Sequence, residues 1–93
     1  MINAKHKGNR RERQSKALLE AAGYTVTKAG GSLGLWDLCG ISATDFVLIQ
    51  VKSNRPPSPA EREALAGFRC PPNTRRLIHV WHDRERVPRV VEL

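Results

Sequence analysis

The 93-residue chain has room for one domain, and its 40% hydrophobic and 27% charged residues are the balance of a folded globular protein. No apolar run approaches the roughly 20 residues that cross a bilayer, and the basic start of the chain lacks the apolar stretch of a secretory signal. A net charge of +7 favours a polyanionic partner, nucleic acid ahead of a membrane surface.

The cysteines and histidines give no sign of a metal or redox motif. Cys39 and Cys70 lack CxxC spacing, so we expect reduced thiols in a cytoplasmic protein. His79 and His82 lie in a predicted strand, where this spacing points them to opposite faces. We therefore expect no zinc site.

The first elements are predicted to be a basic arm, a helix and a short strand. Residues 1–8 are polar and basic, and we expect them to be flexible. Asn9 is predicted to cap a helix over 10–22, with Glu12 as the capping-box acid and Gly23 ending the helix. A strand over 24–27 and a flexible glycine-rich loop over 29–34 follow.

The remaining pattern predicts a mixed sheet. Strands are expected over 36–41 and 45–52, joined by a turn at 42–44, and the second is apolar on both faces, as a central strand is. Ser58, Pro59 and Glu61 predict a capped helix that reaches about Phe68. Strands over 75–82 and 87–93 complete the order α-β-β-β-α-β-β. We predict one α/β domain over residues 9–93, with a mixed central sheet flanked by two helices.

Two polar residues end the predicted central strand on one face. Gln50 and Lys52 follow Leu48 there, and burying an unpaired amide costs about 1–3 kcal/mol, so we expect the pair at a wet rim or in a site. Simple exposure of the strand end is the alternative. If the strand pairs with the preceding one around the turn, Asp37 falls close to Gln50. Carboxylate and amide oxygens suit Mg²⁺, with Lys52 beside them as a cation.

An acid on the first helix is a further candidate. Glu12 lies seven positions before Leu19, so both occupy nearly the same helix face, and Glu12 faces the sheet if Leu19 does. Its alternative roles are the capping box and an i,i+4 pair with Lys16.

Taken together, Glu12, the Gly31-Ser32 loop, Asp37 and the run Gln50-Val51-Lys52 resemble the motifs of the PD-(D/E)XK nuclease superfamily. Within it, the arrangement is most similar to archaeal-type Holliday-junction resolvases and standalone phage-type VRR-NUC domains. The resemblance covers nearly all of residues 8–82 and implies a restriction-endonuclease-like fold. It implies metal binding by Asp37, Gln50, the Val51 carbonyl and Glu12, and catalytic roles for Glu12, Asp37, Gln50, Lys52 and Ser32.

Two positions depart from the superfamily pattern. Trp36 stands where proline precedes the motif aspartate, and Gln50 stands at the second acidic position. The amide removes one negative charge from the implied metal site, so metal affinity should fall and activity could be lost.

The implied function is a Mg²⁺-dependent endonuclease, with Mn²⁺ able to substitute, that acts on branched DNA as a homodimer. The alternatives are a non-catalytic nucleic-acid-binding module that keeps the nuclease fold and, with less support, a winged-helix-like DNA binder that reads DNA with helix 10–22. Six basic residues are expected to contact phosphates, although each could instead belong to a solvated face: Lys7, Arg10, Arg11, Arg13, Lys28 and Arg55.

Overall fold

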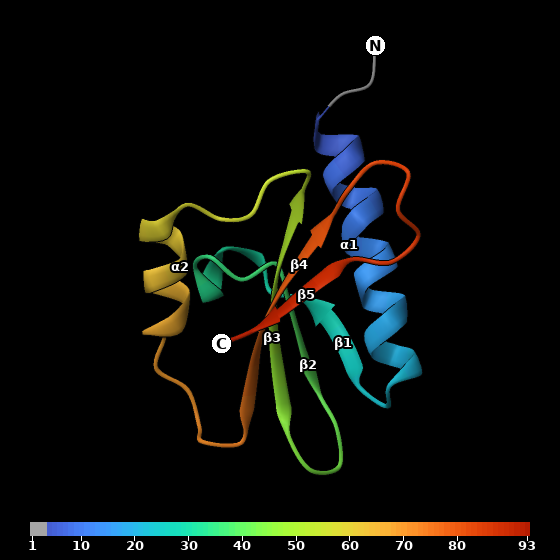
Figure 1. Cartoon of the computed structure of the whole chain (residues 1–93). Coiled ribbons are helices and arrows are strands. Elements are labelled where there is room, and N and C mark those ends of the chain that lie inside the picture. Colours follow the sequence, from blue (N-terminus) through green and yellow to red (C-terminus); the bar gives the residue numbers. More distant parts are fainter. Residues whose placement is uncertain (1–3) are drawn as a thin grey trace.

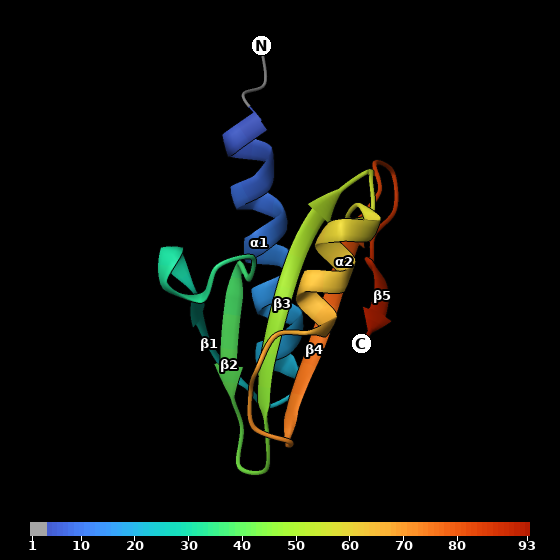
Figure 2. The ribbon, with the colours of Figure 1, turned by 90° about the vertical axis from the view of Figure 1, so that its left-hand side faces the viewer.

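The computed structural model describes the backbone of residues 4–93 and the side chains of residues 9–31 and 33–93. Within them, five strands form one sheet in the order β1-β2-β3-β4-β5, with a helix on either side (Figures 1 and 2). β3 and β4 are parallel and joined through α2, whereas the other neighbours are antiparallel. The predicted element order and mixed sheet are confirmed. The elements are α1 (Ala4–Ala21), β1 (Thr25–Lys28), the 3₁₀ helix η1 (Gly30–Leu33), β2 (Leu38–Ile41), β3 (Phe46–Ser53), α2 (Pro59–Ala66), β4 (Thr74–Trp81) and β5 (Arg89–Glu92).

The start of α1 corrects the prediction. The helix begins at Ala4, so Asn9 and Glu12 lie inside it, and the predicted cap and capping box there are wrong. Of the arm expected over residues 1–8, residues 4–8 are helical, and residues 1–3 lie outside the described part. The first helical residues are polar and include Gly8, a poor helix former, so no apolar periodicity marked them.

The end of α1 is as expected. Gly23 has φ 102°, and Tyr24 N–H donates to the Leu19 carbonyl at 3.1 Å while Gly23 N–H donates to Glu20 at 3.0 Å. This paired closure needs the left-handed conformation that glycine adopts without a Cβ penalty. The chain thereby turns back directly into β1.

Both faces of β3 are buried, which confirms its central place. Val47 and Ile49, both 0% exposed, pack with Leu19 of α1 on one face. On the other face, Leu48 packs with Leu65 of α2 and with residues of β4. Full burial of such side chains contributes about 1.5–3 kcal/mol each, so the two helices are fixed on opposite faces largely by this strand.

The connection from β1 to β2, where a flexible loop is predicted, is partly helical. It contains η1, and Gly30 and Gly34 on either side of its turn have φ 63° and 60°. Trp36 then inserts into the α2-side core with 2% exposure, and β2 begins only at Leu38. Asp37 therefore precedes the strand, held between a buried indole and the first paired residue.

The cap of α2 confirms the prediction from its sequence. Ser58 Oγ accepts from Glu61 N–H at 3.2 Å, and the Glu61 carboxylate accepts from Ser58 N–H at 3.3 Å. The helix ends at Ala66, slightly before the expected Phe68. In the described part of the chain, no helix combines the length and apolarity needed to span a membrane.

A buried polar network ties α1 to β4. Ser15 Oγ, with 0% exposure of the residue, accepts from Trp81 Nε1–H at 2.8 Å and lies 2.8 Å from His79 Nδ1. A hydroxyl has one hydrogen and two lone pairs, so the donor between Ser15 Oγ and His79 Nδ1 depends on the tautomer of the imidazole. Burial lowers the pKa of His79 to about 4, so the imidazole is neutral at neutral pH.

Candidate active site

Asp37 is held against β3 by two backbone contacts. Its N–H donates to the Ile49 carbonyl at 2.9 Å, and its Oδ2 accepts from Val51 N–H at 2.7 Å. These contacts bracket Gln50, so the structure brings Asp37 beside Gln50. The contacts replace regular strand pairing, which ends at Leu38 and Ile49.

Gln50 is buried rather than placed at a wet rim. The residue is 4% exposed, and its Nε2 donates to the Leu35 carbonyl at 3.5 Å. Its Oε1 has no hydrogen-bond partner among the described residues. A buried oxygen without a partner costs about 1–3 kcal/mol, so this oxygen is a candidate ligand for a bound water or ion.

The Val51 carbonyl faces the same side as Asp37. In a strand, the N–H and C=O of one residue point toward the same neighbour. Since Val51 N–H reaches the Asp37 carboxylate, the carbonyl also faces that side, beyond the end of β2. The strand thus offers a main-chain oxygen next to a carboxylate and an amide.

Glu12 lies on α1, near enough to Asp37 for the charge of that carboxylate to affect its pKa. The side chain is about one-fifth exposed, and its carboxylate lies 3.9 Å from Lys28 Nζ. Burial raises the pKa of Glu12, and the negative charge of Asp37 raises it further, while Lys28 opposes the rise. The two carboxylates are therefore close enough to repel each other, a tension that a bound cation would relieve.

The acidity of Asp37 reflects the same surroundings. Burial raises the pKa of Asp37, whereas the Val51 N–H bond and the charge of Lys52 lower it. The partly buried ammonium of Lys52 donates to Glu61 Oε2 at 3.1 Å. Lys52 therefore stands between a carboxylate of the candidate site and a carboxylate of α2.

The donor set fits a hard divalent cation that keeps several waters. No three His, Cys, Asp or Glu side chains gather into a metal cluster in the part of the chain that is described. An ion here would need the Gln50 amide and the Val51 carbonyl in addition to carboxylates. All of these are oxygen donors of the kind Mg²⁺ and Mn²⁺ accept, and the unpartnered Gln50 Oε1 is the observation that favours one.

The expected phosphate-binding residues divide by exposure. Arg10, Arg13, Lys28 and Arg55 are exposed. The prediction that Arg11 contacts phosphates is corrected, because this residue is 5% exposed. Its guanidinium lies 5.3 Å from the centroid of the Trp81 ring and donates to the His82 carbonyl at 3.5 Å. It lies in the interior beneath the β4–β5 turn and is not open to a DNA backbone.

Two other expectations lie outside the described side chains. The backbone of Lys7 is in α1 and that of Ser32 is in η1, but their side chains are not among those described. Their predicted roles in DNA binding and near the scissile phosphate stay predictions.

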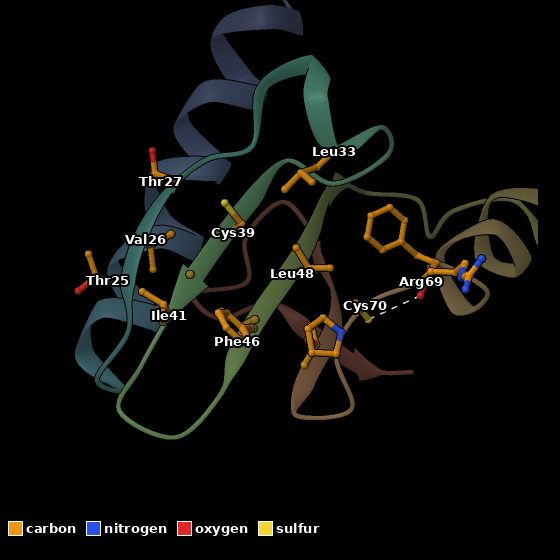
Figure 3. Close-up of a pocket in the computed structure, with 15 residues that line it drawn as sticks. Thr25, Val26, Thr27, Leu33, Cys39, Ile41, Phe46, Leu48, Arg69 and Cys70 are labelled. Carbon is orange, nitrogen blue, oxygen red and sulfur yellow. Dashed lines mark hydrogen bonds between the residues drawn. The ribbon is translucent and has the colours of Figure 1, made fainter.

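A separate cavity of about 520 Å³ lies between β1–β3, η1 and the segment after α2 (Figure 3). Val26, Cys39, Phe46 and Leu48 are among the residues that line it. None of the residues expected to be catalytic or to bind metal is among those that line this cavity, so the candidate site lies elsewhere.

Sequence reasoning missed Glu61 as a neighbour of the site and Arg11 as an interior residue. Glu61 has a complete explanation in the capping box, and no local pattern reports its contact with Lys52. Arg11 had a signal, since Arg11, Ser15 and Leu19 are spaced four apart and lie on one buried stripe of α1.

Comparison with known proteins supports the fold. The chain is similar to the 1.6 Å structure of Archaeoglobus fulgidus Hjc, a Holliday junction resolvase from an archaeal hyperthermophile, with a TM-score of 0.73 and 22% identity over 92% of this chain and 72% of that one. The predicted restriction-endonuclease-like fold is thereby confirmed. No family profile and no curated protein matches the sequence.

Proposed function

We propose that this protein is a metal-dependent DNA endonuclease that hydrolyses phosphodiester bonds and selects branched DNA. The observation that carries the proposal is the buried Gln50 Oε1 without a partner, bracketed by the contacts of a half-buried Asp37. A catalytic pocket is where an unsatisfied polar group and mutually repelling carboxylates are expected.

Asp37, Gln50, the Val51 carbonyl and Glu12 would hold Mg²⁺ or Mn²⁺. When bound, such an ion lowers the pKa of a coordinated water and polarises the phosphoryl oxygen. Lys52 orients the attacking water or stabilises the negative charge that develops on the phosphoryl group. Ser32, in η1, is proposed to lie near the scissile phosphate.

A DNA substrate suits the charge of the chain. The net charge is +7, and Arg10, Arg13, Lys28 and Arg55 present exposed cations. The fold neighbour is a Holliday junction resolvase, which favours branched DNA as the substrate to test first. Cys39 and Cys70 form no disulfide, and an intracellular setting fits such a protein.

Two copies of the chain would act together. A four-way junction is resolved by two symmetric cuts, and each chain offers one candidate site within its described residues. A homodimer with twofold symmetry supplies both cuts.

The test is cleavage of a labelled four-way junction in Mg²⁺ or Mn²⁺, with a linear duplex of the same sequence as the control substrate. We expect wild-type protein to cut the junction. Asp37→Asn and Lys52→Ala should bind it with unchanged affinity and not cut it. Equal cutting by wild type and Asp37→Asn would refute the site.

The alternative is a nucleic-acid-binding module that keeps the nuclease fold without turnover. The amide at position 50, in place of an acid, favours it, because it weakens the charge that attracts a metal. This alternative predicts salt-sensitive DNA binding without cleavage in any divalent metal, and gain of metal binding or cleavage in Gln50→Glu.

A further inference from the structure

Glu61 is fixed at the end of β3 by two different elements. One carboxylate oxygen accepts from Ser58 N–H at 3.3 Å, as part of the capping box of α2. The other accepts from Lys52 Nζ at 3.1 Å. Because the helix cap restrains the carboxylate, Glu61 presents a fixed negative charge to a long and otherwise flexible lysine.

The carboxylate of Asp37 is a second possible partner for the Lys52 ammonium. Asp37 Oδ2 accepts from the N–H of Val51 at 2.7 Å, and Lys52 is the next residue of β3, so the lysine side chain starts one residue from the anchor of that carboxylate. An ammonium that paired with Asp37 would compete for the oxygens that a divalent cation needs. In the structure, Lys52 is bonded to Glu61 instead.

The amide at position 50 makes this competition more serious. An acid there would add negative charge that favours a divalent ion over a single ammonium, whereas Gln50 adds none. Repulsion between the ion and Lys52 would also be stronger without a neighbouring anion. The Lys52 contact keeps the pKa of Glu61 below its usual range, so the carboxylate is charged at neutral pH.

We propose that Glu61 is a positioning residue of the candidate active site: it holds Lys52 away from Asp37 and thereby leaves Asp37 and Gln50 open to a divalent cation. This inference rests on the proposed function. It adds a carboxylate of α2 to the site without making it a metal ligand.

A substitution at Glu61 can remove the negative charge and keep the helix cap. Glutamine can replace glutamate in a capping box, so Glu61→Gln keeps the cap of α2 and removes only the charge that Lys52 needs. Glu63→Gln, at an exposed position of the same helix, is the matched control for charge. Ser58→Ala weakens the cap but retains the carboxylate, and it separates helix stability from lysine positioning.

The first measurement is the affinity of the protein for Mn²⁺, monitored through the electron paramagnetic resonance signal of the free ion. Glu61→Gln should weaken binding roughly two- to five-fold, the size expected for one partly exposed ion pair, while Glu63→Gln and Ser58→Ala leave it unchanged. In a Lys52→Ala background, Glu61→Gln should have no effect, because the competing ammonium is gone.

The second measurement uses metal-free protein. Nitrogen-15 relaxation of the Lys52 ammonium should report a restrained group in the wild type and a mobile or relocated one in Glu61→Gln, at an unchanged melting temperature. An ammonium with the same mobility in both proteins would overturn the inference.

The outcomes separate this inference from the proposed function. Mn²⁺ binding that is indifferent to Glu61→Gln, or that weakens equally in the Lys52→Ala background, overturns the role of Glu61 alone. A wild-type protein that binds no Mn²⁺ overturns both the metal-dependent function and this role.

Discussion

Acidification should destabilise the fold through one buried histidine. His79 is 3% exposed, lies 2.8 Å from Ser15 Oγ and has its pKa lowered to about 4 by burial. The unfolded chain takes up this proton near pH 6.5 and the folded protein only near pH 4. The stability from the neutral imidazole is thus fully present above about pH 6.5 and is lost as the pH falls toward 4.

The size of the effect follows from the two pKa values. The difference corresponds to about 3 kcal/mol in total, of which about 2 kcal/mol is lost by pH 5. A domain of this length is stable by roughly 5–14 kcal/mol, so the loss is a substantial fraction of the total.

The assay is urea unfolding at several pH values between about 7.5 and 5. Unfolding is monitored through the fluorescence of the two buried tryptophans, Trp36 and Trp81. His79→Gln is the control, because the raised pKa values of Glu12 and Asp37 act in the opposite sense and cancel in the comparison. Wild type should lose about 2 kcal/mol more than the variant by pH 5. Parallel pH profiles for the two proteins would refute the neutral, buried imidazole.

Three further tests, two of them with a control substitution, address packing in the fold. Arg11→Ala should destabilise the fold and leave the salt dependence of DNA binding unchanged. Arg13→Ala, at an exposed position, should keep the stability and reduce the slope of log affinity against log salt concentration by about 0.9. A reduced slope for Arg11→Ala and a loss of stability for Arg13→Ala would contradict the burial of Arg11. Gly40→Ala should cost about 1–3 kcal/mol in urea unfolding, because its Cβ would lie 2.9 Å from a side-chain carbon of β3, while Gly31→Ala, with nothing within 4 Å, should be nearly neutral. Ser15→Ala should cost about 1–3 kcal/mol, since it strands a buried indole N–H and an imidazole nitrogen, and an unchanged denaturation midpoint would refute that network.

Local chemical signals predicted the parts of the fold that depend on neighbours in sequence. The cap of α2 was readable because Ser58 and Glu61 satisfy each other's backbone donors within one turn. The central place of β3 was readable from its unbroken apolar run. The start of α1 was not, because its first turns present no apolar stripe.

The parts that were missed are tertiary. The sequence placed Asp37 near Gln50 through strand pairing, but the contacts that hold it are irregular ones just before the start of β2. The burial of Arg11 and the pairing of Lys52 with Glu61 depend on how α1 and α2 meet the sheet. Residue type alone gave Arg11 a surface role that its packing against Trp81 overrides.

The most direct test of the central claim is an anomalous-scattering map of wild-type crystals soaked in Mn²⁺. The proposed site predicts a peak between the Asp37 carboxylate and Gln50 Oε1, and its disappearance in crystals of Asp37→Asn soaked in the same way. A wild-type map with Mn²⁺ bound only elsewhere, or the same peak in both crystals, would contradict the assignment of these residues to a metal-dependent nuclease site.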